Sequence, residues 1–297
     1  MVGQVDERSA VPCMPGFQCG GASDGLLVTA DSLSGEQRQV LRLGGPGEDE
    51  IVSIVMAPEE DDPNFFLFGH TRGKFAAQCD KSPSLSMQMK CGGWDTFLVI
   101  ADPWNGANDT PCLKDCVLPS KTLRGVRTPI RQFGGPNDDR AVVMVMSYIK
   151  GVVDLRRLLY MFGNTNERND IYGGRCLTTT VCSGSSNMQL LVADSRTGKI
   201  LDRLRFGSRG NEVVTAAVAD TRLGVYAAGF TDQEYGDCAR PTPGWEIPQR
   251  EGGGSHFQCG GGDVVIAKFR WNSAVKRVQM DWLTVRCAVP CALAVLF

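Results

Sequence analysis

Cysteine is the residue type with the most potential for chemistry in this sequence. The chain of 297 residues contains 12 Cys but only two His, His70 and His256. A high and even number of Cys favours either a disulfide framework formed in an oxidising compartment or a thiolate metal site. Zinc normally needs four Cys or His ligands brought together, and the sequence has no CxxC motif. We therefore expect disulfides.

Carboxylate side chains could supply acid–base chemistry. Runs of acidic residues occur at Glu48–Glu50, Glu59–Asp62 and Asp138–Asp139. A glycosidase would need two such groups across one pocket, and a hydrolytic triad would need Ser and His partners, which no motif here supplies. We predict no catalytic residue and no metal site. Calcium bound by the acidic, Gly-rich turns is the alternative, because calcium prefers oxygen ligands.

Three Trp and one Asn are the remaining candidate binding or modification residues. Trp94, Trp104 and Trp245 lie in or beside long loops, where aromatic rings could form a surface for a carbohydrate or peptide. The alternative is that these rings cover the ends of sheets. Asn108 begins an Asn-Asp-Thr sequon in a Pro- and Gly-rich insertion, so it is a candidate glycan acceptor in a secreted protein.

The elements that must position these residues form a tandem repeat. Each repeat has a Cys before a Gly-rich turn, an apolar strand, a strand ending in a second Gly-rich turn, an apolar strand, and a strand ending in Gly-x-Thr. The last of these strands occurs at Phe65–Thr71, Leu159–Thr165 and Val225–Thr231. Short apolar strands bounded by Gly and Pro, four to a unit, are typical of propeller blades.

The repeat predicts an all-β fold, a partial β-propeller of roughly three and a half four-stranded blades. Closed propellers have more blades, so we expect further blades or a partner chain to complete the ring. The expected parts are a lead-in at 1–18, repeat units at 19–45, 46–135, 136–208 and 209–286, and a divergent tail at 287–297.

The repeated stretches of this sequence resemble the SBBP-type β-propeller repeat of surface and secreted proteins. The resemblance is carried by Asp49–Thr71 with Gly92–Gly135, Asp139–Thr165 with Ser183–Gly207, and Glu212–Thr231 with Gly260–Phe269. It implies a propeller, often in an extracellular setting, and no settled activity. The chain departs from the family in its Cys-rich loops, and in having Ser183–Asn187 where the family has a Gly-Gly-x-Asp turn.

The Cys residues recur at equivalent positions of the repeat. One precedes each Gly-rich turn, and another lies shortly before it in the same loop, so we predict that each pair closes its own loop. The predicted disulfides are Cys13–Cys19, Cys79–Cys91, Cys176–Cys182 and Cys238–Cys259. The remaining pairs, Cys112–Cys116 and Cys287–Cys291, would form either local disulfides or a thiolate metal site.

Neither His is expected to be catalytic. His70 shares its repeat position with Asn164 and Phe230, a mixture that indicates a turn position rather than an active-site position. His256 lies in a Gly-rich loop.

Charge and the chain ends narrow the function class. The formal net charge is -2, from 31 basic and 33 acidic residues, without a basic stripe, so binding to nucleic-acid phosphates has little support. The first residues lack the apolar segment of a signal peptide, and the C-terminal apolar run is too short to span a membrane. We expect a fragment of a longer secreted or cell-surface protein.

Together these features favour a non-enzymatic extracellular module for protein or glycan binding, adhesion or surface structure. The alternatives are a propeller-type hydrolase or lyase acting on glycans, and an intracellular interaction scaffold with reduced thiols.

Overall fold

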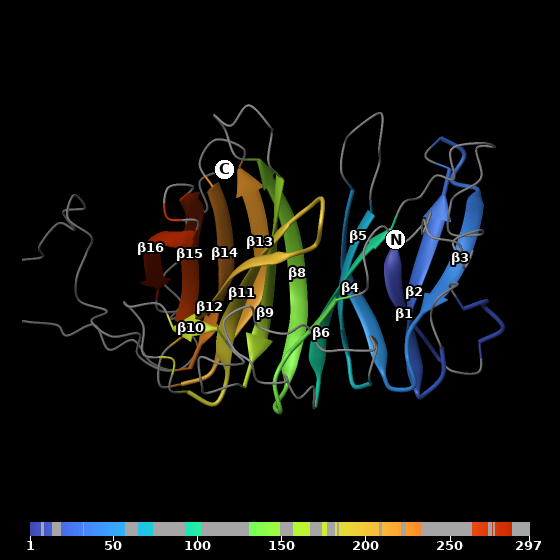
Figure 1. The fold of residues 1–297 in the computed structure, drawn as a ribbon, viewed down its shortest axis with the longest axis horizontal. Coiled ribbons are helices and arrows are strands. Elements are labelled where there is room, and N and C mark those ends of the chain that lie inside the picture. Colours follow the sequence, from blue (N-terminus) through green and yellow to red (C-terminus); the bar gives the residue numbers. More distant parts are fainter. Residues whose placement is uncertain are drawn as a thin grey trace, which may run out of the picture.

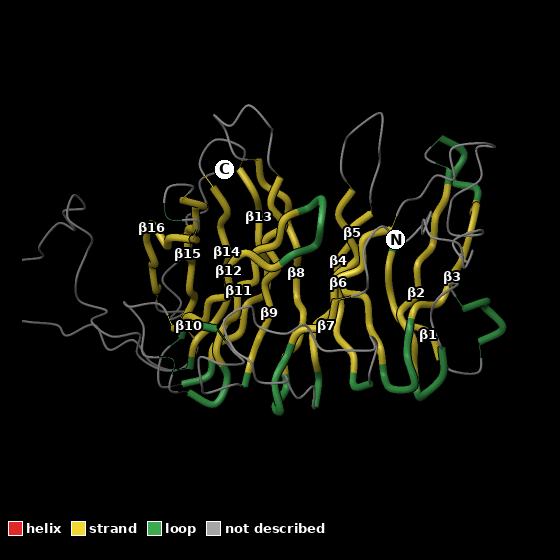
Figure 2. Tube along the Cα trace, viewed as in Figure 1, coloured by secondary structure: helices red, strands yellow, loops and turns green. Residues whose placement is uncertain are grey.

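The chain folds as a stack of β-sheets, seen edge-on in a computed structural model (Figure 1). The structure describes residues 1–6, 9–13, 19–31, 33–56, 65–73, 93–101, 131–148, 157–166, 174–176, 182, 184–207, 210–220, 224–232, 263–272, 275 and 277–286. Within these ranges the regular structure is entirely strand, joined by turns (Figure 2). The predicted all-β fold is therefore confirmed.

Four sheets follow one another in chain order. The first sheet contains β1 (Val2–Asp6), β2 (Ser23–Ala30) and β3 (Gln37–Leu43). The second sheet contains β4 (Asp49–Met56), β5 (Phe65–Thr71), β6 (Asp95–Ala101) and β7 (Arg131–Phe133). The third sheet contains β8 (Asp139–Tyr148), β9 (Arg157–Thr165), β11 (Asn187–Asp194), β12 (Ile200–Phe206) and the short β10 (Arg175–Cys176). The fourth sheet contains β13 (Glu212–Asp220), β14 (Gly224–Thr231), β15 (Asp263–Asn272) and β16 (Arg277–Arg286).

Neighbouring strands run antiparallel, except that β10 joins the outer edge of β12 in parallel. The four-stranded units predicted from the repeat are present in the second and fourth sheets, and the third sheet adds β10 to the same plan. The first sheet gains β1 from the segment expected to be only a lead-in. The short run Val2–Asp6 was not recognised as a strand because it precedes the first repeat motif.

The hydrophobic core lies in three layers between adjacent sheets. Leu27, Leu41 and Leu43 of the first sheet pack against Leu67, Phe97 and Val99 of the second. The second sheet uses its other face to contact the third, and the third uses its other face to contact the fourth. In Figure 1 the first and fourth sheets accordingly lie at opposite ends of the stack.

Burial on both faces explains the apolar strand sequences. In β9, Leu158, Tyr160 and Phe162 belong to the layer with the fourth sheet, whereas Leu159 and Met161 belong to the layer with the second. Successive side chains in a strand point to opposite faces, so a strand covered on both sides needs a continuous apolar run. The same pattern holds at the centre of β11, where Leu190–Ala193 are four consecutive buried apolar residues.

The first strand of the second, third and fourth sheets carries an irregularity at the same place. Its register against the next strand shifts between Ile51 and Ser53, between Ala141 and Val143, and between Val214 and Ala216. A bulge changes which face the following residues occupy. The repeat is thus preserved at the level of local backbone geometry, although the residues at the bulge differ.

Among the described residues, no helix has the length and hydropathy required to cross a membrane. The expected tail at 287–297 lies outside the described residues.

Candidate functional site

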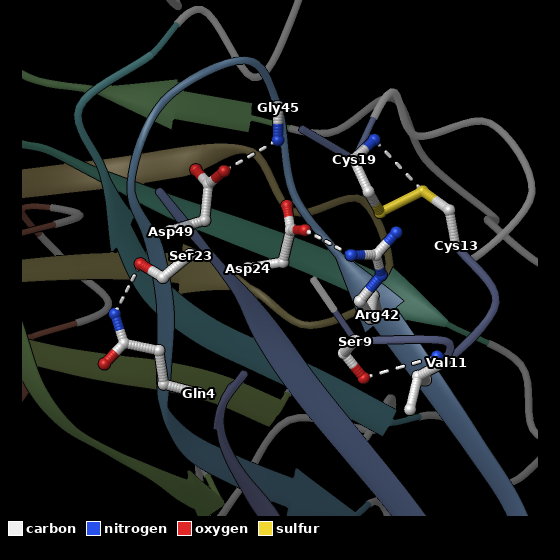
Figure 3. Close-up of polar contacts among 10 residues, drawn as sticks. All are labelled: Gln4, Ser9, Val11, Cys13, Cys19, Ser23, Asp24, Arg42, Gly45 and Asp49. Carbon is white, nitrogen blue, oxygen red and sulfur yellow. Dashed lines mark hydrogen bonds and ion pairs between the residues drawn. A yellow bond between two sulfur atoms is a disulfide. The ribbon is translucent and has the colours of Figure 1, made fainter. Parts of the chain in front are cut away.

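The residues that define the repeat meet at the junctions between sheets. Asp49 is the first residue of β4, and its side chain is fully buried. Its Oδ2 accepts a hydrogen bond of 2.7 Å from the backbone N–H of Gly45 (Figure 3). The same carboxyl group is hydrogen-bonded to the side chain of Thr71, which lies opposite it on β5. Asp49 therefore ties the Gly-Gly turn to the end of the Gly-x-Thr strand.

A second acidic side chain enters this junction from the preceding sheet. Asp24, on β2, is also fully buried. A Cβ atom on Gly44 would overlap Oδ1 of Asp24 and would lie 2.8 Å from Oδ2 of Asp49. Only glycine leaves room for both carboxyl groups, which explains the first Gly of the turn.

The junction between the second and third sheets repeats this arrangement. Oδ2 of Asp139 accepts a hydrogen bond of 3.0 Å from the backbone N–H of Gly135. A Cβ atom on Gly134 would overlap Oδ1 of Asp95. Thr165 lies opposite Asp139, as Thr71 lies opposite Asp49.

The junction between the third and fourth sheets has the same plan with different side chains. A Cβ atom on Gly207 would overlap Oδ1 of Asn187 and would lie 2.5 Å from Oε2 of Glu212. Oε1 of Glu212 accepts a hydrogen bond of 3.1 Å from the Thr231 hydroxyl. Here an amide replaces one of the two acids, so this junction contains a single carboxyl group from the pair.

A long polar side chain from the strand before each turn completes the junction. Arg42 lies 3.4 Å from Asp24, measured from Nη1 to Oδ2 (Figure 3). At the next junction Nε2 of Gln132 donates a hydrogen bond of 2.9 Å to Oδ2 of Asp95. Arg205 occupies the equivalent place in the third sheet, where it is buried and donates through Nε to a backbone carbonyl.

Burial dominates the electrostatics of the first junction. It raises the pKa of Asp49 to about 6, with the nearby Asp24 adding to the rise and hydrogen bonds from Thr71 and Gly45 opposing it. The pKa of Asp24 is also raised, first by burial, with the positive charge of Arg42 acting in the opposite direction. Two buried carboxyl groups this close disfavour double ionisation. The pair is therefore suited to holding one proton.

The junctions are enclosed in protein and are not arranged as an open reaction site. Each brings together two acidic or amide side chains, whereas calcium takes about six to eight oxygen ligands. Among the described residues, no group of three or more His, Cys, Asp or Glu side chains could hold a metal ion. Chemically, each junction can fix the turn that joins two sheets, and the first junction can also retain a proton.

Two of the predicted disulfides are present and occupy equivalent positions. Cys13 is bonded to Cys19, and Cys176 to Cys182, with Cα atoms 5.7 and 6.0 Å apart. Cys13 pairs in parallel with Arg42, and Cys176 pairs in parallel with Arg205. Each disulfide thus closes a loop at the outer edge of its sheet, beside the residue that extends toward the junction.

Trp94, expected as a ligand-surface residue, is buried between the second and third sheets. Its ring lies edge-to-face with that of His70, at 4.8 Å between ring centroids. The guanidinium carbons of Arg72 and Arg140 lie 5.1 and 5.0 Å from its centroid. These neighbours cover the ring, so a ligand could reach it only after the arginines moved.

His70 lies within strand β5 and not in the expected turn, because the strand continues to Thr71 in register with β4 and β6. Its Nε2 is 3.3 Å from Oε2 of Glu50. Burial lowers the pKa of His70, and the negative charge of Glu50 opposes this effect. This position directs its side chain toward the next sheet, which a sequence pattern of His, Asn and Phe did not reveal.

The other candidate residues lie outside the described residues. They are Cys79, Cys91, Cys112, Cys116, Cys238, Cys259, Cys287, Cys291, Trp104, Trp245, His256, Asn108 and the acidic run 59–62.

Sequence reasoning did not identify the paired acids of the junctions. Asp49 was considered only within the acidic run Glu48–Glu50 and the repeat stretch Asp49–Thr71, and Asp24 was not singled out. A signal was available, since acidic or amide residues occupy both positions in all three repeats, as Asp95 with Asp139 and Asn187 with Glu212. Their burial could not be anticipated, because polar residues beside Gly-rich turns are usually exposed.

A comparison of the sequence with protein-family models and with curated proteins finds no match to either.

Proposed function

We propose that this chain forms extracellular β-propeller blades that act as a structural or binding module, with its long inter-strand loops presented to a protein or glycan ligand. The observation that carries the proposal is the burial of the repeat-defining residues at the sheet junctions. The Asp49 carboxyl group accepts hydrogen bonds from both Gly45 and Thr71. The repetition therefore serves the scaffold, and the regions that vary between repeats are the loops.

The stacking of the sheets supports the propeller part of the proposal. Three successive interfaces use opposite faces of each interior sheet, so every unit is stabilised by its neighbours. This is the way in which propeller blades bury their surfaces. The resemblance to SBBP-type repeats agrees with such an architecture.

The disulfides support the extracellular part. Two Cys pairs are oxidised at equivalent loop positions in units that lie far apart in the chain. Disulfides persist mainly in oxidising compartments, where they stabilise loops by restricting the unfolded chain.

Peptide mapping by mass spectrometry under non-reducing conditions tests the compartment. The chain, purified from its native source with free thiols blocked at lysis, should yield linked peptides for Cys13–Cys19, Cys79–Cys91, Cys176–Cys182 and Cys238–Cys259. Blocked, unpaired thiols at Cys79 and Cys91 would instead support a reduced intracellular scaffold.

A glycan array and a protein-capture screen on the intact chain test the binding role, run beside a panel of glycosidase and lyase substrates. We expect saturable binding without turnover. Turnover that survives repurification and disappears with a point substitution would overturn the non-enzymatic proposal.

A further inference from the structure

The fourth sheet presents an apolar face to solvent. On the side away from the third sheet, Val213, Val218, Phe230 and Ile266 are exposed, with Phe230 at 49% and Ile266 at 36%. We call these four residues the outer face. They lie on three adjacent strands, with Val213 opposite Phe230, so they form one surface and are not scattered contacts.

The same positions bind the next sheet in the earlier units. Ile266 corresponds to Leu98 and Leu190, since each of the three lies opposite the third residue before the end of its Gly-x-Thr strand. Leu98 is 1% exposed and packs against the third sheet, while Leu190 is 0% exposed and packs against the fourth.

Phe230, on the neighbouring strand β14, also has repeat counterparts that contact the next sheet. The side chain of its counterpart Asn164, on the third sheet, reaches the fourth sheet. There its Oδ1 accepts a hydrogen bond of 2.9 Å from the backbone N–H of Val214. His70, the other counterpart, is buried against Trp94. The outer face is therefore a continuation of the interface that holds the stack together.

The first sheet carries the complementary half of this interface. Val28 corresponds to Val99 and Leu191, which are buried against their preceding sheets. Val28 itself is only half-buried, and Leu26 and Val40 lie beside it on the same face with similar exposure. We call Val28, Leu26 and Val40 the leading face.

We propose that the outer face of one chain binds the leading face of a second copy of the same chain, in the geometry that joins successive sheets within each copy. In a pair of copies each outer face meets the partner's leading face, so two equal interfaces close the assembly. This inference rests on the sheet-stacking part of the proposed function and not on its ligand-binding part.

Charged residues border the apolar surface at one end. Lys268 and Arg270 lie 3.6 and 3.1 Å from the carboxylate of Asp281, and Lys268 also lies over the Tyr226 ring at 5.6 Å. An apolar centre with a paired polar rim is the usual anatomy of a protein–protein interface. These charged residues therefore mark one edge of the apolar surface that the partner sheet would cover.

The test measures the mass of the intact chain in solution by light scattering across a concentration series. The wild-type chain should reach twice the monomer mass. Phe230→Asp, which disables the outer face, and Val28→Asp, which disables the leading face, should each remain monomeric. Val275→Asp is the matched control, because Val275 is 55% exposed in the β15–β16 hairpin and lies off the outer face.

Mixing the two face variants makes the test directional. Phe230→Asp keeps an intact leading face and Val28→Asp keeps an intact outer face, so the mixture should form a one-to-one complex although neither variant pairs with itself. Non-specific association of apolar surfaces would not give this complementation. Circular dichroism checks the fold, and Ile266→Lys with Leu26→Lys replaces any variant that does not fold.

A wild-type chain that stays monomeric at all concentrations would overturn the proposal, as would a dimer that survives both face substitutions or a mixture that fails to pair. Each of these results is independent of the glycan and protein screens, so failure of the interface can be told apart from failure of the binding role.

Discussion

The recurrence of Asp, Gly-Gly and Thr in this chain has a residue-level cause. Asp49 accepts hydrogen bonds from the turn before it and from Thr71, and Gly44 leaves space for Asp24. A buried carboxyl group must be hydrogen-bonded or protonated to avoid a large desolvation cost. The junction provides both, since its donors hold the Asp49 carboxyl group while burial, together with the nearby Asp24, favours the protonated form.

Asp49 should make stability depend on pH. Its pKa of about 6 in the folded chain exceeds the ordinary value of 3.8, so folding favours the protonated form. The stabilising contribution is complete below about pH 4 and is lost as the pH rises from there through 6, at a cost on the order of 3 kcal/mol. Asp49→Asn should flatten this fall because an amide does not titrate in this range, while its oxygen can still accept the Gly45 hydrogen bond that holds the turn.

Urea unfolding of the disulfide-bonded chain between pH 4.5 and pH 8 measures this effect. Glu36→Gln serves as the control, since Glu36 is an exposed carboxyl group outside the junctions. An unchanged pH dependence in Asp49→Asn would contradict the assignment.

The third junction offers the reverse experiment. Asn187→Asp would place a second acid beside Glu212, where the chain carries an amide. We expect the free energy of unfolding to fall by about 1–3 kcal/mol at pH 8, because a buried charge is left without adequate partners. The loss should shrink at pH 5, where the pair can take up a proton. Equal losses at both pH values would argue against carboxyl repulsion as the cause.

How far the sequence predicts these residues depends on the distance between partners. The pairing of Cys13 with Cys19 was predictable because both residues belong to one loop of one repeat. The meeting of Asp24 with Asp49 was not, because they come from adjacent sheets and their contact depends on how the sheets stack. Thr71 could be placed at the end of a strand, in the Gly-x-Thr motif, but could not be assigned a partner.

At the scale of the elements, glycine controls how closely two sheets approach at each turn. The space beside Gly134 is filled by Asp95, whereas nothing lies within 4 Å of a Cβ atom on Gly3 in β1. These two glycines separate the effect of crowding from the general effect of replacing glycine with alanine.

Gly134→Ala should therefore lower the free energy of unfolding by about 1–3 kcal/mol, because the new methyl group displaces a buried carboxyl group. Gly3→Ala should be neutral or slightly stabilising, since it only restricts the unfolded chain. Denaturant unfolding of both variants at one pH provides the measurement. Similar losses in the two variants would show that the turn is not crowded.

The strands themselves were the most predictable elements. Phe65–Thr71 and its equivalents are short apolar runs bounded by turn residues, and these cues are local. β1 and β10 could not be predicted in this way, because each is short and gains its hydrogen bonds from a strand already placed in the sheet.

At the scale of the whole molecule, stability comes from the contacts between neighbouring sheets. Leu190 lies in the layer between the third and fourth sheets and is fully buried, while Ile266 holds the same position on the face beyond. Repetition of one contact type makes the stack approximately a sum of units and interfaces.

This arrangement predicts unequal effects for two matched truncations. Leu190→Ala should cost about 2–5 kcal/mol, as expected for a cavity in a packed core. Ile266→Ala should cost less than about 1 kcal/mol in the dissociated chain. Unfolding at a protein concentration low enough to keep the chain monomeric provides the comparison. Comparable losses of unfolding free energy in the two variants would mean that Ile266 is packed in a core and does not face solvent.

The stacking order was predictable from the repeat, but whether the stack closes into a ring was not. A tandem repeat indicates that like units contact like units, as the three core layers show. Closure would depend on the angle between sheets, which small differences among packed side chains determine.

Each junction draws its residues from two consecutive sheets, with consequences for how such chains can change length. A segment that supplies one complete junction runs from the strand carrying the first acid, β2 or β6, to the second strand of the next sheet, as in 24–71 or 95–165. Unequal recombination between two such segments would add or remove a whole segment while leaving every remaining acid opposite an acid or amide. Genes encoding this architecture can therefore vary in copy number without inventing a new turn.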